Sequence, residues 1–440
     1  MEKERMETME TIWKQAENLK EELVARRRNL HSHPETGWTE FRTASLIIKE
    51  LEALGYEVHF GAEVVAEASM MGRPSAAELE RYMKRAVTEG ADLALVEKMA
   101  GGKTGVVGIL DTGRPGKTVA FRFDMDCNDV EEDKGEGHRP AAEGFCSTHT
   151  KAMHACGHDG HVTIGLAVAK LLKENMDTLH GRIKLIFQPA EEGVRGALAM
   201  VDAGVVDDVD YLFGGHIGFK CTQADTLVTM TDGFLATTKL DAEFHGVSAH
   251  AGAAPEEGKN ALLAAAQAAI SLSTISRHSQ GSSRINVGVL NAGTGRNVVP
   301  DIASMKIETR GGNTEINEFM VKEARRMLQA AADLYDVKVD ISLAGGAPAS
   351  IYDKELAEEI AALVKEKCGY AHVLTYVDMG GSEDCTYFMD RVQKRGGKAA
   401  YMMYGTPIAA GHHNSHFDFD EEVLWKAAAT LTELAVKYSA

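Results

Sequence analysis

The chain has 440 residues, of which 44% are hydrophobic and 25% charged, and its formal net charge at pH 7 is −18. This length predicts two or three folded domains, and the composition is that of a folded globular protein rather than a disordered one. The negative charge would repel phosphate backbones and anionic lipid headgroups, so we expect neither nucleic acid nor a membrane as a partner.

The sequence also bears on the compartment. Residues 1–20 are charged throughout and contain no apolar core of a secretory signal, and no apolar run approaches the ~18 residues that a membrane span requires. The six cysteines are sparse and irregularly spaced, which is typical of a reducing compartment rather than of a disulfide framework. We therefore expect a cytoplasmic protein.

The N-terminal part of the chain predicts helices followed by an insertion. Residues 10–55 predict two helices, the second over 41–54, where apolar residues recur at helical spacing up to Gly55. Residues 62–102 are charged and rich in methionine, and we interpret them as an insertion that carries one helix over 76–99.

Two strands are predicted after the insertion, over residues 105–110 and 118–123. The turn between them contains Gly113, Pro115 and Gly116, which are typical turn residues. This pattern predicts that the two strands pair as a hairpin.

The following segments alternate between helix and strand. This alternation predicts a layered α/β domain with a largely parallel sheet. The expected helices are 161–174, 196–203, 353–367 and 421–438, and the expected strands are 182–187, 211–216 and 399–404.

A different pattern interrupts this alternation. Its order is β-α-β-β-α-β, with strands at 239–244, 284–290, 304–309 and 338–342 and helices at 260–273 and 315–334. Such an order is ferredoxin-like. We therefore predict a discontinuous α/β domain, residues 1–232 and 346–440, with a small α+β domain inserted at 233–345.

The most specific local motif is His-Ala-Cys-Gly-His-Asp-Gly-His at residues 154–161. Three imidazoles and one thiol within eight residues supply the nitrogen and sulfur ligands that zinc and neighbouring metals prefer. The alternative is a polar helix start capped by Asp159. The crowding of ligand types favours a metal site that includes Cys156 and His158.

A second motif, Gln-Pro-Ala-Glu-Glu-Gly at 188–193, places Glu191 and Glu192 just after an apolar strand. Ligands of open α/β sheets bind outside the carboxyl ends of the strands. One carboxylate could therefore bind a metal while the other acts as a general base. A solvated pair of glutamates is the alternative.

Other metal-type side chains also follow predicted strands. Each alone is more often an ordinary hydrogen-bonded residue, but together they indicate a binuclear site with two metals ~3.5–4 Å apart. These residues are Asp124 and Asp126 after strand 118–123, His216 at the end of strand 211–216, and His412 and His413 after strand 399–404.

Two other enzyme classes are disfavoured. The segment Gly-Gly-Lys-Thr at 101–104 lacks the first glycine of a phosphate-binding loop, because Glu97 stands there. The segment 246–250 ends in His250 where a serine-hydrolase elbow requires glycine.

The inserted domain contributes candidate residues of its own. His250 lies in Ser-Ala-His-Ala-Gly, Asn297 in Asn-Val-Val-Pro, and Arg310 in Glu-Thr-Arg-Gly-Gly. Arg310 could hold a carboxylate through two hydrogen bonds, although a surface ion pair is equally consistent with the sequence. A helix-capping or packing role is the alternative for His250.

Taken together, these motifs resemble metallopeptidase family 20, in its amidohydrolase branch of hippurate and indole-acetyl-amino-acid hydrolases. Within the branch, the insertion at 62–102 and the segments 110–116 and 200–211 are most similar to the p-aminobenzoyl-glutamate hydrolases. The resemblance covers nearly the whole chain. Its motifs lie at residues 27–31, 35–37, 122–126, 154–161, 188–193, 249–252, 297–300, 381–384 and 413–414.

This resemblance implies roles for particular residues. Glu191 is the expected general base, His250 is expected to stabilise the oxyanion, often across a dimer interface, and Asn297 and Arg310 are expected to contact substrate. The implied fold is an α/β metallohydrolase domain with a ferredoxin-like lid and dimerisation domain. Two divalent ions, zinc or manganese, are expected on Cys156, His158, Glu192, His216 and His413, the last being preferred to His412.

The resemblance further implies an activity and partners. We expect hydrolysis of the amide bond of an N-aroyl or N-acyl amino acid, with p-aminobenzoyl-glutamate as the expected substrate. Hippurate, indole-acetyl-aspartate and N-acetyl amino acids are alternatives, as is a metal-binding or ligand-binding relative without activity. We expect a homodimer, or a heteromer with a second, homologous chain.

Overall fold

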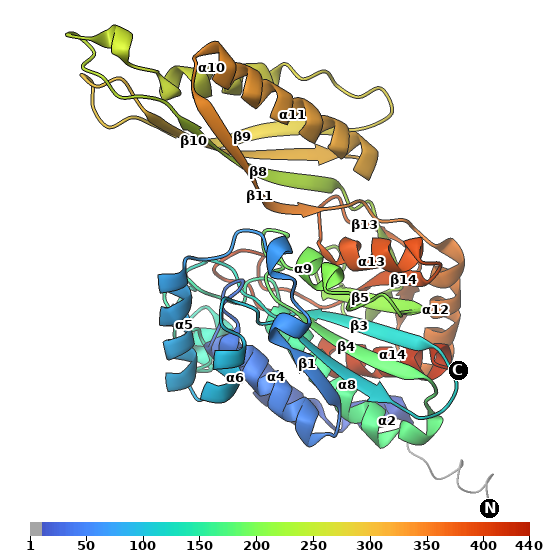
Figure 1. Cartoon of the computed structure of the whole chain (residues 1–440). Coiled ribbons are helices and arrows are strands. Elements are labelled where there is room, and N and C mark those ends of the chain that lie inside the picture. Colours follow the sequence, from blue (N-terminus) through green and yellow to red (C-terminus); the bar gives the residue numbers. More distant parts are fainter. Residues whose placement is uncertain (1–10) are drawn as a thin grey trace, which may run out of the picture.

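The computed structural model describes residues 11–440, so the first ten residues of the segment examined for a secretory signal lie outside the described residues. Three sheets are present in the described part: one of eight strands, one of four and one of two. Figure 1 shows the four-stranded sheet with its helices standing apart from the larger α/β body.

The eight-stranded sheet is parallel in its middle and contains antiparallel pairs toward both edges. Its central strands β4, β3, β5 and β14 run parallel to one another, whereas β1 and β2 pair antiparallel. This arrangement confirms the predicted α/β class. In spatial order the strands are β1 (Glu57–Phe60), β2 (Val106–Asp111), β4 (Arg182–Gln188), β3 (Thr118–Asp124), β5 (Tyr211–Ile217), β14 (Lys398–Tyr404), β6 (Thr226–Val228) and β12 (His372–Leu374).

The predicted hairpin of β2 and β3 is wrong, because β4 lies between them. The loop that joins them crosses the start of β4, where the backbone N–H of Gly181 donates to Arg114 and its carbonyl accepts from Thr112. A Cβ atom on Gly116 would lie 2.2 Å from the carbonyl oxygen of Ser439, so the crossing requires glycine there. The turn residues therefore form a connection that passes over β4 and joins two strands that are not neighbours in the sheet.

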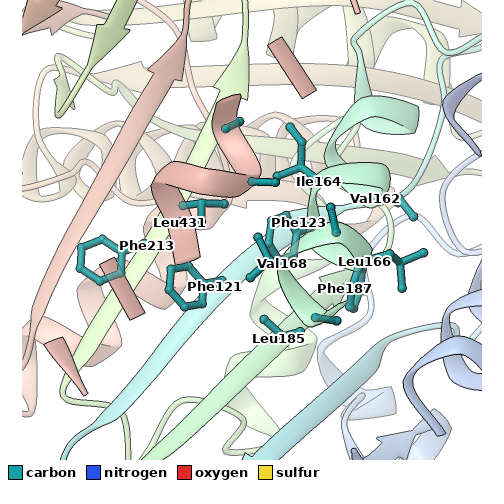
Figure 2. Close-up of a cluster of buried hydrophobic side chains, with 14 of the residues drawn as sticks. Phe121, Phe123, Val162, Ile164, Leu166, Val168, Leu185, Phe187, Phe213 and Leu431 are labelled. Carbon is teal, nitrogen blue, oxygen red and sulfur yellow. The ribbon is translucent and has the colours of Figure 1, made fainter. Parts of the chain in front are cut away.

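Helices cover both faces of this sheet. Figure 2 shows α8 packed on the sheet, with Val168 of α8 among Phe121 and Phe123 of β3 and Leu431 of α14. One face is covered by α2 (Ile12–Glu17), α3 (Lys20–Ser32), α4 (Phe41–Ala53), α8 (His158–Glu174), α12 (Lys354–Lys367) and α14 (Val423–Tyr438). The other face is covered by α9 (Ala197–Asp202) and α13 (Cys385–Lys394).

Three helix predictions require correction. Residues 11–55 hold three helices rather than two, because α2 and α3 are separate. The insertion holds α5 (Ala76–Thr88) and α6 (Leu93–Lys98) instead of one helix, since Gly90 has a φ of 95° and Asp92 caps the second. Helix α8 begins at His158, three residues earlier than predicted, after Gly157 with a φ of 86°.

The four-stranded sheet has the predicted ferredoxin-like topology. Its spatial order is β11-β8-β10-β9 with antiparallel neighbours throughout. Two helices pack on one face and enclose a separate core around Leu240, Phe244, Met305 and Leu328. The elements are β8 (Ala236–His245), α10 (Ala261–Ser273), β9 (Ser283–Ala292), β10 (Ile302–Gly311), α11 (Thr314–Leu334) and β11 (Lys338–Ala347).

The remaining elements are short. They are α7 (Arg139–Ala142) and the strands β7 (Thr231–Asp232) and β13 (Val377–Asp378), which pair in parallel close to the junction of the two larger sheets. Within residues 11–440, no helix is long and apolar enough to cross a membrane. All six cysteines are unpaired.

The motif at 27–31 has a structural role, because Arg27 connects helix α3 to residues distant in sequence. Arg27 of α3 is fully buried, and its guanidinium contacts Asp159 at 2.9 Å, Asp418 at 2.9 Å and Glu421 at 3.3 Å. Burial lowers the pKa of Arg27, but the three carboxylates outweigh it and raise the pKa above its ordinary value. Nδ1–H of His31 donates to the same carboxylate of Asp159, at 2.8 Å.

We expect Arg27→Met to lower the free energy of unfolding by about 3–5 kcal/mol, because it leaves the fully buried Asp159 with His31 as its remaining ion-pair partner in the described chain, whereas Asp418 and Glu421 keep Arg139. Urea denaturation measures the change. Arg182→Met is the control, since Arg182 makes an ion pair with Asp111 that is exposed to solvent, and its loss should have a much smaller effect. Equal effects of the two substitutions would contradict the structural role of Arg27.

Candidate metal centre and active site

The candidate site lies at the carboxyl ends of the central strands. Strands β3, β4, β5 and β14 are neighbours in the sheet, and each is followed or ended by polar residues of the predicted motifs. Open α/β sheets bind their ligands at this edge. The loop after β4 carries Glu191 and Glu192, while β5 contributes His216 near its end.

Six of the predicted residues form one cluster at this edge. The Sγ atom of Cys156 lies 3.4 Å from Nε2 of His216, and Nε2 of His413 lies 3.3 Å from Oε1 of Glu192. Their donor atoms fall into overlapping groups within 4.8 Å: Cys156 with His158 and His216, Cys156 with Glu192 and His413, and His158 with Glu191 and Glu192.

Backbone contacts orient the two buried imidazoles toward this cluster. Nδ1 of His158 lies 2.8 Å from the carbonyl oxygen of Asp126, and Nδ1 of His216 lies 2.8 Å from that of Ile217. When the rings are neutral, Nδ1–H donates in both, and each Nε2 is then an acceptor that faces the cluster. This is the usual arrangement of histidines that bind a metal.

The loop with the two glutamates is fixed by Asp126. Its carboxylate accepts the backbone N–H groups of Glu191 at 2.9 Å and Glu192 at 3.0 Å. Asp126 itself is fully buried. The two neighbouring carboxylates are therefore held by their backbone, and their side chains point into the same pocket.

Two observations indicate that the residues of the cluster can bind divalent cations, although Oε1 of Glu192 also lies in ion-pair range of His413. Nε2 of His158 and Oε1 of Glu192 are buried and form no hydrogen bond with any residue in the range 11–440, and such buried polar atoms normally have a partner. The donor set of one thiol, three imidazoles and a carboxylate suits zinc or manganese. Cations would satisfy both unpaired atoms.

Burial and neighbouring charges shift the pKa values of the cluster residues in different directions. Burial and the neighbouring Glu383 and Glu192 raise the pKa of Glu191 well above its ordinary value. Burial also raises the pKa of Glu192, but His413 and His158 outweigh it and lower that pKa to about 2. For His158, burial lowers the pKa and Asp124 and Asp126 raise it to about 10.

A pocket of about 250 Å³ joins this cluster to the four-stranded sheet. Lys239 of β8 and Arg310 of β10 line it opposite the glutamates. Nζ of Lys239 donates to the carbonyl of Gly193 at 3.0 Å, and Arg310 donates to Glu308 at 3.2 Å. Two cations therefore face the candidate metal ligands across the pocket.

His250 and Asn297 do not join the cluster within this chain. Both are exposed, and they follow the far ends of β8 and β9, where His250 and Val298 form an isolated bridge. Lys239 lies in the pocket, and His245 stands six residues farther along β8, or ~20 Å at the usual rise per residue. The imidazole Nδ1 of His250 accepts N–H groups from Gly252 and Ala253.

The structure distinguishes His413 from His412. His413 belongs to a group with Cys156 and Glu192, whereas Nε2 of His412 donates to the carbonyl oxygen of Ile217 at 3.1 Å. Asp124 is likewise engaged, with His161 at 2.5 Å and Arg122 at 2.6 Å.

Lys239 and Glu383 are pocket residues for which the sequence predicted no role. Lys239 carries no motif, and only the strand register places it on the same sheet face as Arg310, whose partner in β8 is Thr237. Glu383 lies in the motif at 381–384, accepts from Arg122 at 2.9 Å and from the hydroxyl of Tyr401 at 2.7 Å, and thus borders the pocket in a fixed position.

The fold and the cluster together define the chain as a metal-dependent hydrolase. The model of peptidase family M20/M25/M40 matches residues 120–437. The chain belongs to this family, which confirms the resemblance inferred from its motifs.

Its relatives extend over the full length of the chain. It is 49% identical to one of the subunits of p-aminobenzoyl-glutamate hydrolase from Escherichia coli, over 98% of this chain and 99% of that protein. It is also 49% identical to the indole-3-acetyl-aspartic acid hydrolase of Enterobacter agglomerans, over 95% and 96%. The crystal structure of an aminobenzoyl-glutamate utilization protein from Klebsiella pneumoniae is similar, with a TM-score of 0.84, 41% identity and coverage of 96% and 97%.

Proposed function

We propose that this chain is a di-metal amidohydrolase that cleaves p-aminobenzoyl-glutamate to p-aminobenzoate and glutamate. Two ions, zinc or manganese, would be held by Cys156, His158, Glu192, His216 and His413. The observation that carries the proposal is one pocket with these ligands and Glu191 on one side and two cations on the other. We expect an amide bond beside a carboxylate to bind between them.

The proposed reaction depends on Glu191. Two divalent metal ions held by these ligands would polarise the scissile carbonyl and lower the pKa of the attacking water toward ~7. Glu191 accepts a proton from that water, hydroxide adds to the carbonyl carbon, and Glu191 then delivers the proton to the leaving amine nitrogen. Its position supports this role, because its backbone is fixed by Asp126 while its carboxylate lines the pocket.

The positive charges of Arg310 and Lys239 favour a substrate whose leaving group is a dicarboxylic amino acid. Arg310 has a planar donor set that matches the α-carboxylate of the substrate, and Lys239 supplies a second positive charge for the side-chain carboxylate. The names of both relatives above contain a conjugate of an acidic amino acid. These local cations would offset the negative field of a chain with a net charge of −18.

We expect Arg310→Ala to lower kcat/KM for p-aminobenzoyl-glutamate about 10- to 100-fold, the range for a lost hydrogen bond to a charged group. Lys239→Met should lower it for the glutamate conjugate but much less for benzoyl-glycine, which lacks the second carboxylate. Release of free amino acid, with and without chelator, is the assay. The α-amide of the substrate serves as the matched control on the wild type and on Arg310→Ala.

The results separate the alternatives. If the α-amide is cleaved as well as the acid, Arg310 does not bind the α-carboxylate. Preference for indole-acetyl-aspartate would favour the activity in the name of the second relative, and preference for hippurate or N-acetyl amino acids would favour a broader amidohydrolase. Failure to release any amino acid from the whole panel would favour a metal-binding or ligand-binding relative without activity.

We further propose that residues 233–345 form a lid and dimerisation domain. His250 of the partner subunit would stabilise the oxyanion formed on the carbonyl, and Asn297 would contact substrate from the same direction. The exposure of both residues supports a role outside their own pocket. The edge strand β9 exposes Val289 and Leu290, each 39% exposed, which suits pairing with a second chain.

The partner is a second copy of this chain or a homologous chain, because the name of the first relative describes it as one subunit of its enzyme. We propose the cytoplasm as the compartment, because the thiols of all six cysteines are free, as is usual in reducing surroundings.

A further inference from the structure

A second pocket lies beside the insertion, apart from the metal cluster. It has a volume of about 560 Å³, against about 250 Å³ for the pocket at the cluster, and the two share no lining residue. One wall is helix α5 of the insertion, and the other is the loop at 148–152, which precedes the motif with Cys156.

Three cations face this pocket: Arg81 and Arg85 of α5 and Lys151 of the loop. The guanidinium groups of Arg81 and Arg85 lie over the ring of Tyr82, at 5.0 and 4.8 Å from its centroid. Nη2 of Arg81 donates to the Tyr82 hydroxyl at 3.3 Å, and the cation–π contacts leave the other N–H donors of both guanidinium groups available.

Arg81 and Arg85 interact electrostatically with Glu78 and Glu35, respectively, but neither carboxylate lies within ion-pair distance. No ion pair involves Arg81, Arg85 or Lys151 among residues 11–440, and the Nε atom of Arg85 is buried without a hydrogen bond. By contrast, Arg27, Arg122 and Arg139 are each paired with carboxylates. A buried guanidinium donor normally has an acceptor, so the pocket lacks an oxyanion that its donors are placed to bind.

The rest of the lining supports this interpretation. Asp129 is its one carboxylate, and the ring of His149 is already paired with Glu89 at 2.7 Å. Thr148 and Thr150 add hydroxyl groups, which can donate to carboxylate or phosphate oxygens. Three positive charges against one negative charge form a local attraction for anions in a chain whose net charge is −18.

We propose that the insertion builds a second ligand site, which binds a small organic anion through Arg81, Arg85 and Lys151. The ligand carries at least one carboxylate or phosphate group, and the pocket has the volume of an ordinary small-molecule site. The site gives the insertion a function separate from hydrolysis. Its lining is connected to the segment that carries Asp126, the residue that accepts the backbone N–H groups of the two glutamates, because Asp129 follows Asp126 by three residues and Thr36 bridges to Cys127.

Calorimetric titration of the metal-loaded enzyme with inorganic phosphate, and separately with glutamate, tests the proposal. We expect at least one of the two probes to bind with a Kd of about 1 mM or tighter. Phosphate binding alone would indicate a phosphorylated ligand, and glutamate binding alone a carboxylate ligand. Arg85→Met and Lys151→Met should each weaken that binding at least ~10-fold, because each removes a charged donor.

Lys84→Met is the matched control. Lys84 lies on the same helix and carries the same charge, but it is paired with Glu80 outside the pocket, so its loss should leave binding unchanged. Lys151 is exposed, which keeps the test valid even if Arg85→Met fails to fold. Absence of binding by both probes, or binding that Arg310→Ala abolishes while Lys151→Met does not affect it, would overturn the proposal.

Discussion

Glu191→Gln is expected to lower the rate of amide hydrolysis at least ~100-fold, while metal content is unchanged. Glutamine keeps the size of the side chain and cannot accept the proton of the attacking water, and a general base contributes ~10²–10⁴-fold. Steady-state kinetics and elemental analysis of the same protein preparation measure the two quantities. Near-normal turnover would end the assignment of Glu191 as the base.

Glu192→Gln is the matched comparison for this variant, since it makes the same chemical change one residue later. Oε1 of Glu192 lies 3.3 Å from His413 in the cluster of candidate ligands. We therefore expect this variant to lose bound metal as well as activity. If both variants lose metal equally, the two glutamates do not have separate roles.

His250→Ala is the second large expected effect, with a fall in kcat of ~10²–10³, the range for one lost oxyanion donor. Its exposed position, beyond the end of β8 that lies away from the pocket of its own chain, predicts that it acts on a partner subunit. Mixing the Glu191→Gln and His250→Ala proteins after subunit exchange should then restore activity. One site in each mixed dimer is complete, which gives about a quarter of wild-type activity.

The two parent variants, each measured alone after the same exchange treatment, are the controls. Light scattering establishes that dimers are present in all samples. No recovery in the mixture would mean that His250 acts within its own chain or has no part in catalysis. A fully active monomer would exclude the dimer as a requirement for catalysis.

Many of the candidate site residues could be predicted from the sequence because they lie at or near strand ends. Cys156, Glu192 and His216 all lie next to buried apolar strands or the helix that follows them, and parallel strands bring their carboxyl ends to one edge whatever the details of the sheet. The ferredoxin-like order was equally accessible, because its strands and helices alternate with clear periodicity.

The errors arose where tertiary contacts override local pattern. Turn residues at 113–116 are compatible with a hairpin and with a crossing, and only the insertion of β4 between β2 and β3 decides between them. No sequence motif marks Lys239, because its place in the pocket depends on the register of β8 against β10. The cationic pocket on α5 was also inaccessible, since Lys151 comes from a loop far from that helix in sequence.

The most direct test of the central claim is a metal titration of the metal-free protein, with release of glutamate from p-aminobenzoyl-glutamate as the readout. We predict no activity without metal and a rise that reaches its plateau at two zinc or manganese ions per chain. Cys156→Ala should weaken this binding. Hydrolysis that is independent of added metal, or a protein that binds two ions and cleaves none of the N-acyl amino acids tested, would contradict the claim.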